Sequence, residues 1–166
     1  MKESQLGFEL VLVESGHRSS LYTVQFDHSD VTELEKWATD DRITSHPEFD
    51  GVYGALRSIP NEGAPDDYFF KSAKYRGWIT PFVAAGYHEL RLYCVKYDEH
   101  EWVIAGNGCI KDDDGPLQQF PRCRRTHRDI QYVDERVSQR LRGDDFFDLY
   151  AHESRLEGDF DFPPQP

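Results

Sequence analysis

The sequence predicts an α+β domain, in which an antiparallel sheet of about four to five strands carries two N-terminal helices and one long C-terminal helix. Three observations lead to this class: two stretches of helical periodicity follow an early strand, a hairpin comes late in the chain, and a long helical stretch follows the hairpin. The chain has 166 residues, which is the length of one domain of ordinary size. We therefore expect one domain rather than two.

Two apolar stretches near the N-terminus predict strands. Residues 6–13 (LGFELVLV) alternate imperfectly and predict a short strand at the edge of the sheet. Residues 21–26 (LYTVQF) alternate more regularly, with Leu21 and Thr23 on one face and Tyr22 on the other. The second stretch is therefore the better strand of the two.

Two helices are predicted after these strands. The first begins at Asp30, which together with Glu33 resembles a capping box, and it ends near Ile43. The second spans residues 49–59 and ends at Pro60, although two glycines weaken its helical propensity. The apolar residues at helical spacing are Val31, Leu34, Trp37 and Ala38 in the first helix and Phe49, Val52, Leu56 and Ile59 in the second.

The stretch of residues 89–111 (ELRLYCVKYDEHEWVIAGNGCIK) predicts the central hairpin. Residues 90–97 carry bulky side chains on both faces, as expected of a strand that is covered on both sides. Residues 98–101 are polar and form the turn, and residues 102–105 begin a second apolar strand. A hairpin alone is marginal in water, so the helices must cover it.

The segments on either side of the hairpin complete the domain. Before it, residues 68–72 predict a strand and residues 77–86 an exposed excursion. After it comes a long helix that Gly143 ends. We expect residues 1–143 to form a single domain, and residues 144–166 to be an acidic, aromatic tail whose last residues are mobile. The apolar stripe of the long helix consists of Ile130, Val133, Val137 and Leu141.

The charge of the chain is unevenly distributed. The net charge is −12, which opposes nucleic-acid binding because the neutralisation of phosphates requires Lys and Arg. Residues 115–143 are the exception, with 7 Arg against 3 Asp and Glu, whereas residues 144–166 have 1 basic residue against 7 acidic ones. Because arginine suits phosphate or carboxylate recognition, residues 115–143 are the predicted anion-binding segment. The overall acidity would also suit adaptation to high salt.

The cysteines give little sign of special chemistry. Cys94, Cys109 and Cys123 are widely spaced and form no CxxC pair, so we expect buried thiols. Cys123 and His127 lie four residues apart, which is a weak zinc signal, and no metal or cofactor is predicted. No apolar run approaches the roughly 20 residues that cross a bilayer, and the first ten residues lack a signal-peptide pattern. We expect a soluble cytoplasmic protein with no membrane partner.

The hairpin also carries a short motif. Arg91, Leu92 and Tyr93 lie on its first strand, and Gly108 and Lys111 lie at the end of its second strand. This segment resembles the part of RelE/ParE-superfamily toxins in which an arginine-bearing strand precedes a strand that ends in a glycine and a lysine.

The resemblance covers residues 21–111. It implies a compact toxin fold, a cognate antitoxin as protein partner and metal-independent cleavage of messenger RNA on the ribosome; ParE-like poisoning of a topoisomerase is a smaller branch. Such cleavage requires a proton donor or acceptor near the ribose 2′-hydroxyl and cations near the phosphate. The candidate catalytic residues are Arg91 and Lys111, which match the motif, and His127 and Tyr132, which are chosen for their chemistry alone; Arg124, Arg125 and Arg128 are candidate RNA- or phosphate-binding residues.

Other interpretations stay open. The arginines of the long helix would also suit a solvated helix face, and Arg91 would suit an ion pair within the sheet. The chain is longer and more acidic than small toxins of this kind, so the alternative function is a non-catalytic protein-binding module on the same fold. A further hypothesis is that the acidic tail after Gly143 covers the arginines of residues 115–143 and mimics a phosphate or an antitoxin.

Overall fold

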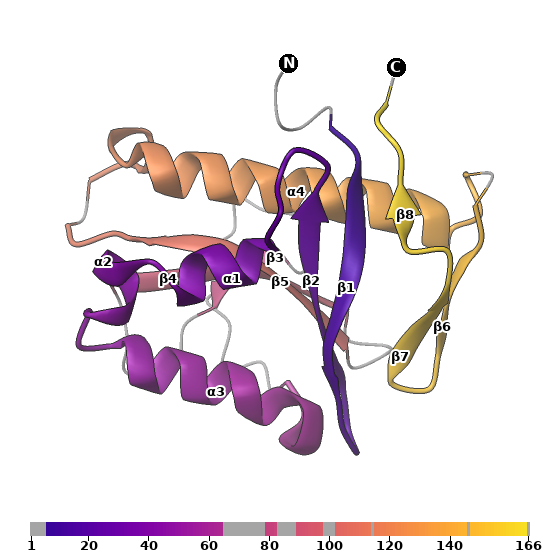
Figure 1. Cartoon of the computed structure of the whole chain (residues 1–166), viewed down its shortest axis with the longest axis horizontal. Helices are drawn as coiled ribbons and strands as arrows, with labels where there is room; N and C mark the ends of the chain where they lie inside the picture. The colour runs from indigo at the N-terminus through magenta and orange to yellow at the C-terminus, as the bar shows by residue number, and fades with distance from the viewer. Residues whose placement is uncertain are drawn as a thin grey trace.

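A central sheet separates two layers of helix, with α4 on one face and α1, α2 and α3 on the other (Figure 1). The computed structural model describes residues 6–64, 79–82, 89–97, 102–113, 115–145 and 147–165. The elements in chain order are β1 (Phe8–Ser15), β2 (Ser20–Phe26), α1 (Glu33–Ala38), α2 (Asp41–Thr44), α3 (Phe49–Glu62), β3 (Ile79–Phe82), β4 (Leu90–Tyr97), β5 (Trp102–Ile110), the 3₁₀ helix η3 (Leu117–Gln119), α4 (Pro121–Leu141), β6 (Leu149–His152), β7 (Arg155–Gly158) and β8 (Asp161–Phe162).

The main sheet has six strands in the order β3-β4-β5-β2-β1-β8. The predicted α+β class and the long C-terminal helix are confirmed. The sheet is mixed rather than wholly antiparallel, because Ser20–Thr23 of β2 pair in parallel with Trp102–Ala105 of β5. A parallel pair needs a long connection, and here the chain passes through all three N-terminal helices and the β3–β4 pair before it reaches β5.

The central strand β4 contributes to two separate cores, as its bulky alternation predicts. Tyr93 and Val95 pack toward α4, in a core that also contains Phe8, Trp102 and Val133. The alternate residues of β4 face the opposite way and pack against the N-terminal helices; these are Leu90, Leu92 and Cys94. The sheet is therefore covered on both faces where β4 and β5 lie.

The N-terminal helices begin and end at positions other than those predicted. Thr32, and not Asp30, is the N-cap of α1, and its side chain accepts a hydrogen bond from the Glu35 amide. The predicted helix to Ile43 is two helices, because the Asp40 side chain accepts from the Arg42 amide and starts α2. Helix α3 extends past the predicted end and is closed at Gly63, whose φ is +89°.

The residues before the hairpin are described only in part. The strand predicted at residues 68–72 lies outside the described residues. Of the excursion predicted at residues 77–86, only Ile79–Phe82 are described, and they form β3 at one edge of the sheet.

The tail after α4 folds back onto the domain. Strands β6 and β7 form a hairpin, and β8 pairs with β1 through Phe8↔Phe162 and Glu9↔Asp161. Phe162 falls among the last residues, which the sequence predicts to be mobile, yet it is buried and stacks on Phe8 with 4.6 Å between ring centroids. Figure 1 accordingly shows β8 beside β1.

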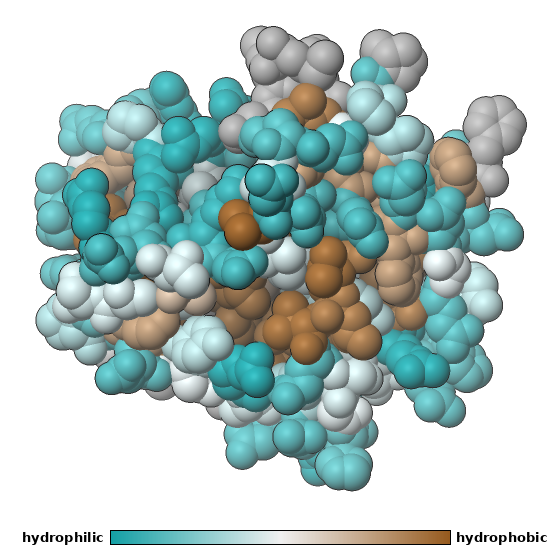
Figure 2. Space-filling model, in the orientation of Figure 1, coloured by the Kyte–Doolittle hydropathy of each residue, from teal (hydrophilic) through white to brown (hydrophobic). Residues whose placement is uncertain are grey.

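The helices α1, α2 and α3 leave the β1 side of the sheet uncovered (Figure 1). On that face, hydrophobic residues gather over β1 and β2 and are surrounded by hydrophilic ones (Figure 2). Val11 and Val13 of β1 alternate with Phe8 and Leu10, which face α4, and both are half-buried, while Val31, before α1, is 37% exposed. Exposed apolar patches of this kind are typical of protein-binding surfaces.

Candidate functional site

The first two turns of α4 carry a group of exposed arginines. Arg124, Arg125 and Arg128 are all exposed, and their spacing of three and four residues places them on one side of the helix. Among the described residues, none of these three guanidinium groups has a hydrogen-bond or ion-pair partner. We call these three residues the arginine face.

The arginine face is unfavourable for the helix that carries it. The N-terminus of a helix carries a partial positive charge, so each cation there costs about 0.3–1 kcal/mol, and like charges one turn apart cost about 0.2–0.5 kcal/mol per pair. No acidic residue lies in the first turn of α4, and the N-cap Phe120 supplies no side-chain hydrogen bond. Helix stability therefore does not explain the position of these arginines.

Arg122, in the same turn, has a different role. It donates from Nε to the Gly108 carbonyl oxygen (2.8 Å) and from Nη2 to the Asn107 side chain (3.2 Å), and it pairs with Asp40 through Nη1. The hydrogen bond from Arg122 lowers the pKa of Asp40. Arg122 thus ties the start of α4 to β5 and to the N-cap of α2.

A cavity of about 230 Å³ lies beside this turn. Strand β2 pairs with β5 only as far as Ala105, and the cavity lies along the later part of β5. Arg42 is exposed at the cavity and has no side-chain partner within the described part of the chain. The residues that line it include Arg42, Ile43, Gln119, Phe120, Cys109 and Cys123.

Arg91 and Lys111, the two charged residues of the toxin-like motif, lie at one end of the β4–β5 hairpin. Arg91 is opposite Cys109 in the strand register, and its buried Nε has no hydrogen-bond partner among the described residues. Lys111 donates to the Asp113 carbonyl oxygen (2.9 Å) and lies 5.1 Å from the centroid of the Phe120 ring. The ion pair considered for Arg91 is not found within the described ranges. Both residues are therefore near the start of α4.

The two predicted proton-transfer residues are buried and do not join the arginine face. His127 is 5% exposed and packs edge-on against Tyr93, with 5.3 Å between ring centroids. The Tyr132 hydroxyl donates to the Leu6 carbonyl oxygen (3.0 Å) and accepts from Arg136 (2.7 Å). Both residues lie on the side of α4 that contacts the sheet, which explains their burial.

The burial of His127 makes stability dependent on pH. Burial lowers the pKa of His127 from 6.5 to about 4, so between these values the unfolded chain binds a proton that the folded chain does not. We expect the free energy of unfolding to fall by roughly 3 kcal/mol from this group as the pH drops from 6.5 to 4. Urea titrations across this range should show a shallower fall in the free energy of unfolding for His127→Gln than for the parent. A fall in the free energy of unfolding of His127→Gln as steep as that of the parent would contradict the lowered pKa of His127.

The expectation of three buried thiols is wrong for two cysteines. Cys109 and Cys123 form a disulfide between β5 and the first turn of α4. Cys94 is buried and free as predicted, and burial raises the pKa of its thiol. Because the sulfur of Cys123 is in the disulfide, the considered zinc pair of Cys123 and His127 does not form. Spacing alone did not reveal the disulfide, since it depends on how α4 docks on the sheet.

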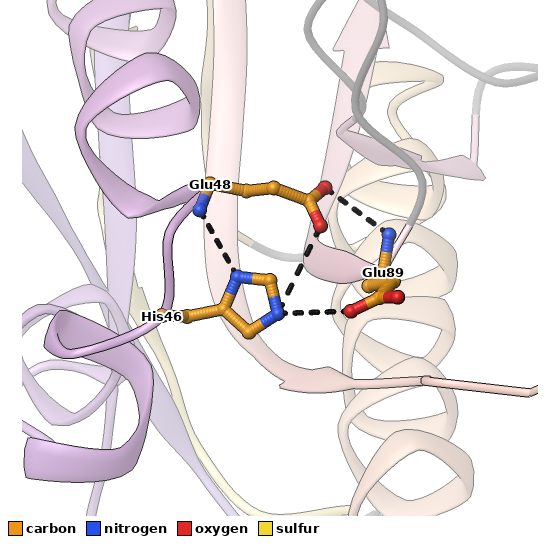
Figure 3. Close-up of side chains that lie close together, drawn as sticks. All are labelled: His46, Glu48 and Glu89. Carbon is orange, nitrogen blue, oxygen red and sulfur yellow. Dashed lines mark hydrogen bonds and ion pairs between the residues drawn. The ribbon is translucent and has the colours of Figure 1, made fainter.

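One cluster was missed by reasoning from the sequence. His46 Nε2 lies 3.2 Å from Glu89 Oε2 and 3.8 Å from Glu48 Oε2, while His46 Nδ1 accepts a hydrogen bond from the Glu48 amide (Figure 3). An accepting Nδ1 leaves the ring proton on Nε2, whereas a metal at Nε2 would need that lone pair and a proton on Nδ1. The cluster is therefore suited to linking the start of α3 to the start of β4, and not to holding a cation.

Comparison with known proteins assigns no family to the chain. The chain matches no family model, no curated protein and no solved structure. Within the described residues, no helix is long and apolar enough to cross a membrane.

Proposed function

We propose that this chain is a non-catalytic protein-binding module, and that the arginine face of α4 binds an acidic segment of its partner. The observation that carries the proposal is the exposure of Arg124, Arg125 and Arg128 without side-chain partners in the described part of the chain. Each guanidinium presents a planar fork of donors that can bind a carboxylate through two hydrogen bonds. An acidic peptide segment would supply carboxylates to these three guanidinium groups, which the described part of the chain does not do.

The charge of the whole chain favours a protein partner over a nucleic acid. A nucleic acid carries a phosphate at every step and needs a basic surface along its length. The net charge of this chain is −12, so its remaining surface would repel an extended polyanion. A short acidic segment needs only the small basic area that the arginine face offers. The exposed apolar patch over β1 and β2 (Figure 2) also supports a protein partner.

The positions of the candidate proton-transfer groups support binding without catalysis. Cleavage of RNA without a metal needs a base or an acid within hydrogen-bond reach of the reacting oxygen. His127 is 5% exposed and Tyr132 6%, and neither side chain is on the exposed side of α4. The arginine face can therefore hold an anion but has no proton-transfer partner from this set.

A RelE-like toxin, acting as a ribosome-dependent endonuclease and bound by an antitoxin, is the second candidate. The order of β2, the N-terminal helices, β4 and β5 agrees with the order that the resemblance implies. Arg91 and Lys111 lie at the same end of the β4–β5 hairpin, as its motif requires. An antitoxin with an acidic segment would also be a partner of the kind proposed above.

The arginine face can be tested by removing its charge. We expect the triple variant Arg124→Gln, Arg125→Gln, Arg128→Gln to bind a fluorescent glutamate-rich peptide at least about tenfold more weakly than the parent, because three charge-assisted contacts of about 0.5–1 kcal/mol are lost. Fluorescence anisotropy at two salt concentrations would measure this. Arg57→Gln, which removes an exposed arginine from α3, is the matched control.

Two results would contradict the proposed function. One is equal peptide binding by the parent and the triple variant. The other is ribosome-dependent cleavage of messenger RNA by the parent that is lost in Arg91→Ala and Lys111→Ala, which would favour the toxin instead.

A further inference from the structure

We infer that the Cys109–Cys123 disulfide is a reversible redox site that holds the arginine face in its binding geometry. The inference rests on the proposed function, because it concerns the regulation of the same surface. In the disulfide form the first turn of α4 is fixed to β5. Reduction by a dithiol frees that turn, so that the side chains of Arg124 and Arg125 no longer keep their positions relative to Arg128.

The first turn of α4 has little stability of its own. Its N-cap Phe120 offers no side-chain acceptor, and its first turn contains no acidic residue. The charges of Arg124 and Arg125 oppose the helix dipole. Proline at the first position of the helix is favourable, but it contributes no amide donor. The turn therefore depends on its links to the rest of the domain.

Among the described residues, two of these links start from side chains of the turn itself. Arg122 binds the Gly108 carbonyl oxygen and Asp40, and Cys123 is bonded to Cys109. Cys109 lies on β5 beyond the last residue that pairs with β2. The disulfide closes a loop with a sequence separation of 14, and a crosslink of that size typically contributes about 3 kcal/mol. Its loss would leave the turn attached through the hydrogen bonds of Arg122 and the packing of Phe120 and Cys123.

The disulfide is placed to act on one part of the arginine face. Cys123 directly precedes Arg124 and Arg125 in the sequence. Arg128 is one turn further on, next to the buried His127 and Ile130, and Ile130 belongs to the core between α4 and the sheet. Reduction should therefore release Arg124 and Arg125 while Arg128 keeps its position. An acidic segment that needs all three would bind more weakly.

The chemistry is thiol–disulfide exchange with a small dithiol. A thiolate of the dithiol attacks one sulfur of the pair and releases the other as a thiolate, and its second thiol then closes on the mixed disulfide. The products are two protein thiols and the oxidised, cyclic reductant. Cys109 is 1% exposed and Cys123 0%, so attack requires the turn to open toward the adjoining cavity. A partner that binds the disulfide form more tightly should make the disulfide harder to reduce at equilibrium, since coupling between two sites is reciprocal.

Hydrogen exchange followed by mass spectrometry tests the redox site without any partner. We expect dithiothreitol to speed exchange of the amides of residues 124–127 at least tenfold; in the disulfide form the Arg124 amide donates to the Phe120 carbonyl oxygen (3.0 Å). Residues 130–137 should keep their protection. Cys94→Ser should respond as the parent does, and the double variant Cys109→Ser, Cys123→Ser should exchange as the reduced protein does under both conditions.

The same samples separate this inference from the proposed function. Reduction should weaken binding of the glutamate-rich peptide at least threefold in the parent and not at all in the double variant. Unchanged exchange at residues 124–127 on reduction overturns the redox site, whatever the peptide affinity. Loss of the near-UV circular dichroism signal on reduction also overturns it, because the disulfide would then support the whole fold. If exchange responds but the disulfide form binds no peptide, the proposed function fails, and with it the regulatory role.

Discussion

Replacing Arg140 with alanine is expected to lower the free energy of unfolding by about 3 kcal/mol and to release the tail from the domain. Arg140 is 1% exposed, and it donates from Nη1 to the carbonyl oxygens of Asp159 (3.0 Å) and Asp161 (2.7 Å). Its guanidinium also lies 3.6 Å from the centroid of the Phe162 ring. Alanine would leave two part-buried carbonyls without this donor and would remove the guanidinium that packs on Phe162.

The measurement should separate the tail from the rest of the domain. Urea unfolding gives the change in stability, and hydrogen exchange should show lost protection at residues 149–163 before the core residues of α4 are affected. Arg142→Ala is the matched control, because Arg142 pairs with Asp144 at a site where both side chains are 61% exposed. Such exposed pairs contribute about 0–1 kcal/mol. A loss at Arg140 no larger than that at Arg142 would contradict the role given to Arg140.

The contacts of Arg140 also decide between two views of the tail. The sequence suggested that the acidic tail covers the arginines of residues 115–143 as a phosphate mimic. The tail contacts Arg136 and Arg140 through backbone carbonyl oxygens, including that of Pro163 (2.7 Å from Arg136 Nη2). Its carboxylates pair only at the end of α4 within the described residues, Asp145 with Arg140 (3.6 Å) and Asp144 with Arg142 (3.1 Å). No contact between the tail and the arginine face is present among the described residues. The tail is therefore a structural element that leaves the proposed binding surface open.

Local sequence patterns predicted the parts of the fold that local forces determine. The stripe of α4 was correct, with Ile130, Val133 and Val137 all buried, because a long amphipathic helix has a strong periodic signal. The hairpin of β4 and β5 was also correct, since bulky residues on both faces suit a covered strand. The early helix was less accurate, because Thr32 caps α1 in place of Asp30 and a second cap, Asp40, starts α2.

Features that join distant parts of the chain could not be predicted in the same way. The parallel pairing of β2 with β5 and the Cys109–Cys123 disulfide depend on how separate elements dock. His127 and Tyr132 were chosen for their chemistry, although each lies on the side of α4 that becomes buried. The exposed Arg124, Arg125 and Arg128 were identified from charge alone, and the structure places them together because their spacing matches the helix period.

Gly108→Ala is expected to destabilise the domain by about 3 kcal/mol, because the added methyl group has no room. A Cβ at Gly108 would overlap the Arg91 carbonyl oxygen and lie 2.9 Å from the Leu92 Cα, and both are backbone atoms that cannot turn aside. The strand register is already irregular next to this position, between Leu92 and Cys94. The extra atom should therefore force β4 and β5 apart, which urea unfolding would measure as a lower midpoint.

A second glycine provides the control for this prediction. Gly54 lies on the exposed side of α3, and a Cβ there would meet nothing within 4 Å, so Gly54→Ala should stabilise the protein by about 0.5–1 kcal/mol. Equal effects at the two positions would contradict the close approach at Gly108. The difference expected between Gly108→Ala and Gly54→Ala also concerns the toxin-like motif, because the backbones of Gly108 and Arg91 lie close together. Close strand packing is sufficient to explain the glycine of the toxin-like motif. Any function of that motif would therefore depend on the side chains of Arg91 and Lys111.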